Sequence, residues 1–148
     1  MAFDHRGVKL RKGILDEVGR LGHEPVDLGT DKSDPPVDYP DKARDVAESL
    51  RSGESERGIL VCGSGVGASV AASKIVGVRA AICHDTYSAR QGVEHDDMNV
   101  LCIGSGVVGG DLAAELVAAY LAAEFDGGAR YRRRLEKVEA IEREASNV

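Results

Sequence analysis

Residues 59–69 read Ile59-Leu60-Val61-Cys62-Gly63-Ser64-Gly65-Val66-Gly67-Ala68-Ser69. The branched apolar residues predict a buried strand, and the alternating glycines after it predict a tight loop. The small residues from Ala68 to Lys74 are typical of a helix opening. A strand, a glycine loop and a helix in this order place free backbone N–H groups at the positive end of a helix dipole, which suits an anion.

Cys62 lies at the point where this strand is expected to end. A thiol beside a helix N-terminus loses its proton more readily, so Cys62 is a candidate base or nucleophile. Cysteine is also a common small core residue, and the loop by itself leaves both interpretations open. The glycine spacing matches neither GxGxxG nor a Walker loop, so the loop carries no dinucleotide or nucleoside triphosphate signature.

Apolar and amphipathic segments alternate along the chain. We expect strands at about residues 2–3, 25–28, 58–61, 78–83 and 99–103, and helices at about 8–21, 41–50, 68–76, 86–93, 110–121 and 129–144. Repeated βα units with apolar strands predict an α/β fold with a doubly wound, parallel, five-stranded sheet in a three-layer αβα sandwich. No repeat, linker or low-complexity segment interrupts residues 1–148, so we expect a single domain.

Length, charge and cysteine content limit the class of protein. The net charge of −6 over 148 residues gives no general attraction to nucleic acid or to an anionic membrane. No apolar run approaches the ~18 residues that a spanning helix needs, and no basic-then-apolar leader opens the chain. Cys62, Cys83 and Cys102 lie near strand-like runs without a CxxC pair, which predicts reduced thiols, a cytoplasmic location and no zinc site.

Polar side chains follow three of the expected strands. In parallel sheets, ligands bind beyond the carboxyl ends of the strands. The residues at these ends are Asp4 and His5, Cys62 and Ser64, and His84 and Asp85. We expect them to surround a ligand, although Asp4 could cap the first helix and Ser64 is an ordinary turn residue.

Two further segments are chemical candidates. In Glu94-His95-Asp96-Asp97-Met98-Asn99, His95 is a candidate general acid or base, and a structural histidine in a turn before a strand is the alternative. Consecutive residues rarely converge on one ion, and partners at ligand spacing are lacking, so we expect no metal.

Arg130 and Arg134 lie one helical turn apart and could bind a phosphate, whereas a solvated helix start is the ordinary explanation.

Six segments together resemble the type B ribose-5-phosphate isomerases and the related galactose-6-phosphate isomerase subunits. They are Asp4-His5-Arg6-Gly7, Asp38-Tyr39-Pro40, residues 62–67, residues 94–101, residues 104–109 and Gly127-Gly128. They occur in the family's order and span almost the whole chain. The resemblance implies an aldose–ketose isomerase of a phosphorylated sugar that works through an enediolate without a metal or another cofactor.

The resemblance also implies roles for individual residues. Cys62 corresponds to the base that moves a proton between C2 and C1, and Ser64 to a hydroxyl that assists this transfer. Some relatives use a glutamate at the position of Ala68, so this chain fits the cysteine branch. His95 and Asp4 correspond to the group that opens the sugar ring. The implied substrate-binding residues are His5, Tyr39, Gly63, Gly65, Val66, Gly67, Asp96, Arg130 and Arg134. The amides of residues 65–67 would stabilise the oxyanion.

Family sites are built across a dimer interface. The resemblance therefore implies a homodimer, or a tetramer, that uses the C-terminal helix for dimerisation and in which His95 and the arginines serve the neighbouring subunit. Gly106 departs from the pattern because the family has a phosphate-contacting arginine there, and Tyr131 replaces a histidine. Losing such a contact could cost about 1.5–3 kcal/mol of substrate binding. Arg6, Arg132 or Arg133 would then compensate, or the substrate would differ.

The expected reaction is therefore the conversion of ribose 5-phosphate to ribulose 5-phosphate. Three alternatives stay open. They are the isomerisation of a hexose or tetrose phosphate, a weakly active binding or regulatory subunit, and an acyl or phosphoryl transferase that uses Cys62 as its nucleophile.

Overall fold

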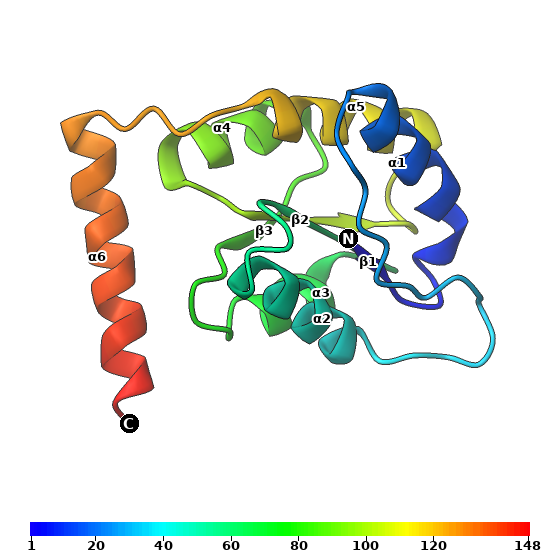
Figure 1. Cartoon of the computed structure of the whole chain (residues 1–148), viewed down its shortest axis with the longest axis horizontal. Helices are drawn as coiled ribbons and strands as arrows, with labels where there is room; N and C mark the ends of the chain where they lie inside the picture. Colours follow the sequence, from blue (N-terminus) through cyan, green and yellow to red (C-terminus); the bar gives the residue numbers. More distant parts are fainter.

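The computed structural model describes all 148 residues. Its elements are β1 (Ala2–Phe3), α1 (Val8–Arg20), α2 (Tyr39–Arg51), β2 (Gly58–Cys62), α3 (Val66–Ala72), β3 (Ala80–Ile82), α4 (Thr86–Asp96), β4 (Val100–Gly104), α5 (Gly110–Ala122) and α6 (Ala129–Ser146). Figure 1 shows a central sheet between helices, with α6 standing at one side of this body. The alternation of strands and helices follows the sequence prediction.

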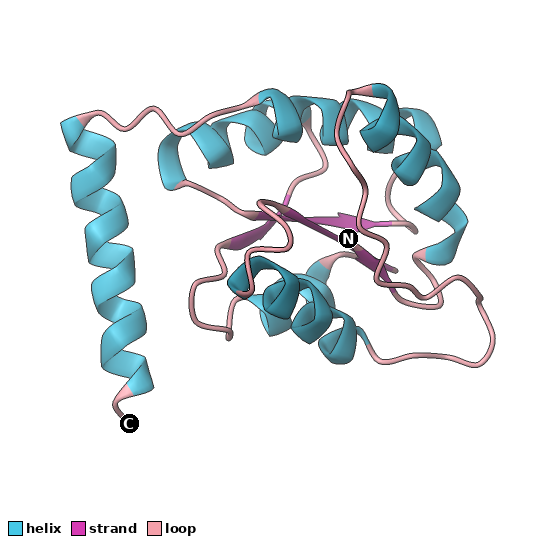
Figure 2. Cartoon of the chain, viewed as in Figure 1, coloured by secondary structure: helices cyan, strands magenta, loops and turns pink.

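The strands form one parallel sheet in the order β1-β2-β4-β3. β2 and β4 are paired along their whole length, from Gly58 opposite Val100 to Cys62 opposite Gly104. Helices α1, α4 and α5 cover one face of the sheet, and α2 and α3 cover the other (Figure 2). This arrangement confirms the doubly wound, three-layer α/β sandwich.

Alternate residues of each strand feed two separate cores, because successive side chains of a strand point to opposite faces. Ile59 and Val61 belong to a core of 19 buried residues beneath α1, α4 and α5. Leu60 and Cys62 belong to a smaller core of 11 buried residues beneath α2 and α3. The thiol of Cys62 therefore faces the side of the sheet on which α3 begins.

The expectation of a fifth strand at residues 25–28 is wrong, since the sheet has four strands. The segment does run beside β1: the N–H of Leu28 donates to the Met1 carbonyl at 2.9 Å, and the N–H of Phe3 donates to the Gly29 carbonyl at 2.7 Å. Pro25 has no N–H for a ladder, and the φ of 74° at Gly29 takes the backbone out of the extended region. The pairing therefore stays too short to form a strand.

Helix α4 is longer than expected, and this changes the setting of His95. Asp85 caps the helix, because its Oδ1 accepts the N–H of Ser88 at 2.6 Å. The helix continues to Asp96 and ends where Asp97 adopts a left-handed conformation with φ 51°. His95 therefore lies on the last helical turn, beyond the expected helix end at residue 93, and the alternative of a turn histidine before the strand is wrong.

Helix α6 has no buried residue and meets the body near α4 and at Gly77, whose N–H donates to the Glu142 carboxylate at 2.9 Å. It exposes two large apolar side chains, Val138 at 52% and Ile141 at 66%. None of the helices combines the length and the apolar character that crossing a membrane would require.

Candidate active site

Cys62 ends β2 with its side chain almost fully buried. The backbone N–H of Gly65 donates to the Cys62 Sγ atom at 3.2 Å. Gly65 has a φ of 81°, a left-handed conformation that favours glycine, and this bend turns its N–H back toward the sulfur. The thiol is thus held at the base of the loop that the sequence predicted.

The loop uses two of its amides internally. The N–H of Gly65 is bound to Cys62, and the N–H of Val66 donates to the hydroxyl of the exposed Ser64 at 3.2 Å. Gly67 lies in the first turn of α3, where a helix leaves its N–H groups without backbone acceptors. The expected set of three free amides at residues 65–67 is therefore reduced to Gly67.

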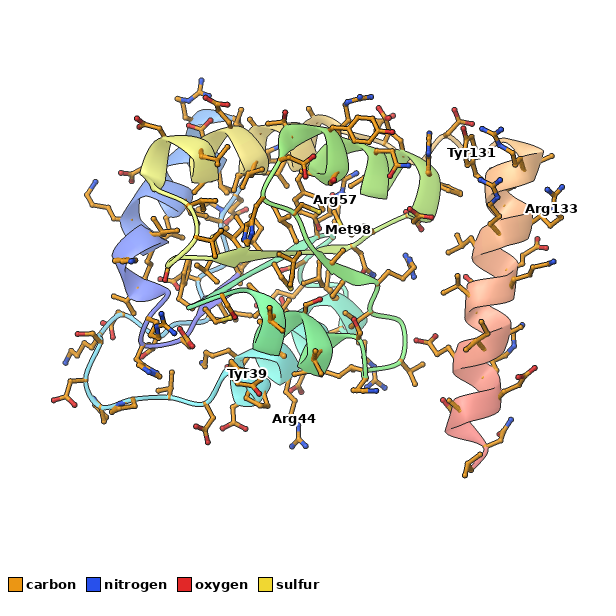
Figure 3. The ribbon with its side chains drawn as sticks, turned by 180° about the vertical axis from the view of Figure 1, so that it is seen from behind. Tyr39, Arg44, Arg57, Met98, Tyr131 and Arg133 are labelled. Carbon is orange, nitrogen blue, oxygen red and sulfur yellow. The ribbon has the colours of Figure 1, made fainter.

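Tyr39, the first residue of α2, lies over this loop. A Cβ placed at Gly67 would be 2.7–2.9 Å from three atoms of the Tyr39 ring, so the ring rests directly on the bare backbone of Gly67. Figure 3 shows Tyr39 on the side of the molecule formed by α2 and α3. Its side chain keeps an exposed face, with 41% of the residue accessible. The structure therefore brings Tyr39 to the Cys62 loop.

Asp4 and His5 follow β1 at the same edge of the sheet. The Oδ1 atom of buried Asp4 accepts the N–H groups of Arg6 at 2.9 Å and of Gly7 at 2.8 Å, while its Oδ2 atom makes no hydrogen bond in the chain. The Nδ1 atom of His5 lies 3.1 Å from the carbonyl oxygen of Val37 and 3.3 Å from its nitrogen. His5 is thus anchored through one ring nitrogen, and the other is free to meet a ligand.

The loop after β4 connects the loop after β1 to the end of β2. The N–H of Ser105 donates to the Cys62 carbonyl at 2.8 Å, and the Ser105 hydroxyl donates to the Arg6 carbonyl at 2.7 Å. A cavity of about 410 Å³ opens here, lined by His5, Arg6, Val8, Lys9, Ser33 and Ser105. The structure therefore gathers residues from the β1, β2 and β4 loops at the carboxyl edge of the sheet, where ligands bind in such folds.

The polar residues after β3 have structural roles. The Nε2 atom of His84 accepts the N–H of Gly104 at 2.9 Å, and Asp85 caps α4. The N–H of Ser88 holds the pKa of the Asp85 carboxyl below its ordinary value. Burial raises the pKa of the Cys83 thiol to about 11 and also raises the pKa of Cys102 strongly. Cys83 and Cys102 are therefore neutral core residues.

His95 belongs to a separate group of side chains between α4 and α6. Its Nδ1 atom lies 2.9 Å from the Nε2 atom of Gln91, and its ring stacks on Tyr131 with centroids 4.4 Å apart. Arg130 donates to the Tyr131 hydroxyl at 2.6 Å. Figure 3 shows Tyr131 at the start of α6, with Arg133 on the outer side of that helix. Arg134 and Asp96 are exposed, and their side chains make no hydrogen bond.

This group lies at the opposite edge of the sheet from Cys62. Asn99, which follows α4, accepts the N–H of Gly58 at 2.8 Å through its carbonyl and the N–H of Arg79 at 2.7 Å through its side chain. Gly58 begins β2 and Cys62 ends it, so α4 reaches its last turn at the amino edge of the sheet. Within one chain, the structure does not bring His95, Arg130 or Arg134 to the thiol.

Two partners of His95 were missed in the sequence. Gln91 precedes His95 by four residues, a spacing that places both on one helical face, but this signal needs a helix that extends to Asp96. In the sequence Tyr131 stands out only as a departure from the family pattern, and no sequence pattern indicates that it stacks on a histidine 36 positions away. No group of three His, Cys, Asp or Glu side chains is placed to hold a metal ion, and the metal-free chemistry stays a prediction.

Comparisons with known proteins identify the family. The family described as Ribose/Galactose Isomerase matches residues 1–138. The chain is 45% identical over 139 residues to ribose-5-phosphate isomerase B of Escherichia coli, covering 94% of this chain and 92% of that protein. It is 38% identical over 125 residues to D-erythrulose-4-phosphate isomerase of Pectobacterium atrosepticum, covering 84% of this chain and 82% of that protein. The solved structure of Clostridium thermocellum ribose-5-phosphate isomerase B matches with a TM-score of 0.92 and 45% identity over 97% of this chain and 96% of that one. This chain therefore belongs to the ribose/galactose isomerase family.

Proposed function

We propose that this chain is an aldose–ketose isomerase of a phosphorylated sugar, with the conversion of ribose 5-phosphate to ribulose 5-phosphate as its preferred reaction. The observation that carries the proposal is the position of the Cys62 thiol. It lies at the base of the glycine loop that contains Ser64, and the Tyr39 ring covers this same loop. Family membership supports the reaction class.

Proton transfer at C2 is assigned to Cys62. In the open-chain sugar its thiolate removes the C2 proton, the C–H electron pair forms a C1=C2 double bond, and the C1 oxygen takes up the negative charge. The Ser64 hydroxyl passes a proton from O2 to O1, and the Cys62 thiol returns its proton to C1, which leaves a ketone at C2. The N–H of Gly67 is the loop amide that remains free to stabilise the oxyanion.

Ring opening and phosphate binding are assigned to residues of two chains. His95, Arg130 and Arg134 lie at the far edge of the sheet from Cys62, so they would act on the site of a second copy. The exposed Val138 and Ile141 on α6 support an interface through this helix. We propose a homodimer, which could pair into a tetramer, in which the partner's His95 opens the ring together with Asp4. Its arginines would bind the phosphate together with His5.

We propose a pentose phosphate as the preferred substrate and the cytoplasm as the location. One relative is named for a pentose phosphate and another for a tetrose phosphate. Three buried, unpaired cysteines support the reducing conditions of the cytoplasm.

A panel of tetrose, pentose and hexose aldose phosphates, assayed for ketose formation, tests the proposal. Fastest turnover of ribose 5-phosphate is expected. Faster turnover of a tetrose or hexose phosphate would change the substrate and keep the reaction class. Binding without any ketose formation would favour a regulatory subunit, and a covalent adduct on Cys62 would favour a transferase.

A further inference from the structure

The backbone of Arg6 is held between the loop after β1 and the loop after β4. Its N–H donates to the Asp4 Oδ1 atom at 2.9 Å, and its carbonyl accepts the Ser105 hydroxyl at 2.7 Å. Its guanidinium, in contrast, makes no hydrogen bond and no ion pair in the chain. The backbone is therefore held while the charged group is left unpaired.

The guanidinium of Arg6 lies on the bare backbone of two glycines. A Cβ at Gly63, in the loop after Cys62, would collide with the guanidinium. A Cβ at Gly106 would lie 3.3 Å from the Arg6 Nη2 atom and 3.0 Å from the Gly63 carbonyl oxygen. The N–H of Gly106 donates to that carbonyl at 2.8 Å, which joins the two glycines into one surface. A Cβ at Gly63 would displace the guanidinium, and one at Gly106 would crowd it.

The cavity beside this surface suits an anion. His5, Arg6 and Lys9 contribute basic groups, Ser33 and Ser105 contribute hydroxyls, and no carboxylate lines it. A guanidinium presents a planar set of donors that matches two phosphate oxygens at once. An unpaired guanidinium in a cavity of this composition is therefore ready to bind a phosphate group.

We infer that Arg6 binds the phosphate of the substrate from the same chain that supplies Cys62, in the space that Gly63 and Gly106 leave open. The inference rests on the proposed function, because the phosphate is taken to belong to a sugar substrate. It accounts for the departure at Gly106: a side chain there would crowd Arg6, so the cation comes from the loop after β1 instead of the loop after β4.

The test compares Arg6→Ala, Arg6→Gln, Gly106→Arg and Arg6→Ala/Gly106→Arg with the unmodified chain. Binding of inorganic phosphate is measured by calorimetry, and KM is measured with ribose 5-phosphate. Arg6→Gln guards against a folding defect, because glutamine keeps a hydrogen-bonding side chain without the charge. Arg44→Ala is the matched control, since Arg44 is exposed on α2 and points away from the body in Figure 3.

Both Arg6 variants are expected to weaken phosphate binding and to raise KM about ten- to a hundredfold, the effect of losing a charged hydrogen-bond partner. Gly106→Arg alone is expected to bring no gain, because it crowds Arg6 and the Gly63 carbonyl. The double variant is expected to recover part of the affinity, and Arg44→Ala to change nothing.

Phosphate affinity and KM that stay unchanged in both Arg6 variants would overturn the inference. Calorimetry needs no turnover, so it separates this failure from a failure of the proposed function. If no sugar phosphate is isomerised while Arg6→Ala still loses phosphate, the assignment of Arg6 stands and the isomerase proposal falls.

Discussion

The ring of Tyr39 lies so close to Gly67 that a Cβ at Gly67 would be 2.7 Å from the Tyr39 Cζ atom. The contact joins the first residue of α2 to the second residue of α3, so it fixes the ring over the loop that holds Cys62. The shape of the site thus depends on a position where any side chain would displace the aromatic ring.

Gly67→Ala is therefore expected to lower kcat/KM about ten- to a hundredfold, because displacing Tyr39 and the Gly67 N–H misplaces the reacting carbons. Steady-state kinetics with ribose 5-phosphate measure the effect. Gly13→Ala is the matched control, since a Cβ at Gly13 in α1 meets no atom within 4 Å. Unchanged kinetics in Gly67→Ala would show that the contact does not shape the site.

Tyr131→Ala should reduce kcat by up to about tenfold, because an aromatic pair contributes about 0.5–1.5 kcal/mol and the His95 ring would lose its stacking partner. Tyr131→Phe keeps the stack and removes only the hydroxyl that Arg130 contacts, so it should leave kcat nearly intact. Separate kcat and KM values distinguish the two variants. Equal losses in both would mean that the hydroxyl matters and the stack does not.

Mixing Cys62→Ala with His95→Ala should restore activity if subunits exchange. A random mixture of two dimers forms heterodimers in about half of its molecules, each with one intact site, so recovery should approach about a quarter of full activity. The double variant Cys62→Ala/His95→Ala mixed with His95→Ala should recover nothing. Heterodimers that are proven by mass spectrometry and remain inactive would contradict shared sites.

Alkaline stability should depend on Cys83. Burial, aided by the nearby Asp85 charge, raises the pKa of its thiol from 9.0 to about 11. Between these values the unfolded chain loses the proton and the folded chain keeps it, so stability falls as the pH rises. Melting temperatures across pH 8 to 11 should decline less steeply in Cys83→Ala, and parallel curves would contradict the assignment.

The sequence was most informative where the periodicity of apolar residues is strong. The runs that became β2 and β4, and the helical spacing of Leu10, Ile14 and Val18, predicted the layers of the fold because burial follows these periods directly. The prediction of a strand at residues 25–28 was wrong because this segment runs beside β1 while Pro25 and Gly29 prevent a regular ladder.

Contacts between distant segments were beyond the reach of local patterns. The position of Asp4 and Cys62 at strand ends was enough to predict that they share one edge of the sheet. The contact of the Arg6 guanidinium with Gly63 and Gly106, in contrast, depends on the packing of the loops after β1, β2 and β4. Nothing in the sequence spacing of these residues predicts it. The same holds for the stacking of His95 on Tyr131.

The central claim is that the Cys62 thiol transfers the proton between C2 and C1. The most direct measurement follows ribose 5-phosphate in deuterium oxide by NMR with three proteins: the unmodified chain, Cys62→Ala, and Cys102→Ala as the control for a buried cysteine on the neighbouring strand. The unmodified chain and Cys102→Ala should form ribulose 5-phosphate, with deuterium at C1 in the molecules for which the Cys62 thiol exchanges its proton with solvent before returning it. Cys62→Ala should bind the sugar and form neither the ketose nor the label. Turnover by Cys62→Ala within about tenfold of the unmodified chain would contradict the assignment, because removing the only base should cost far more.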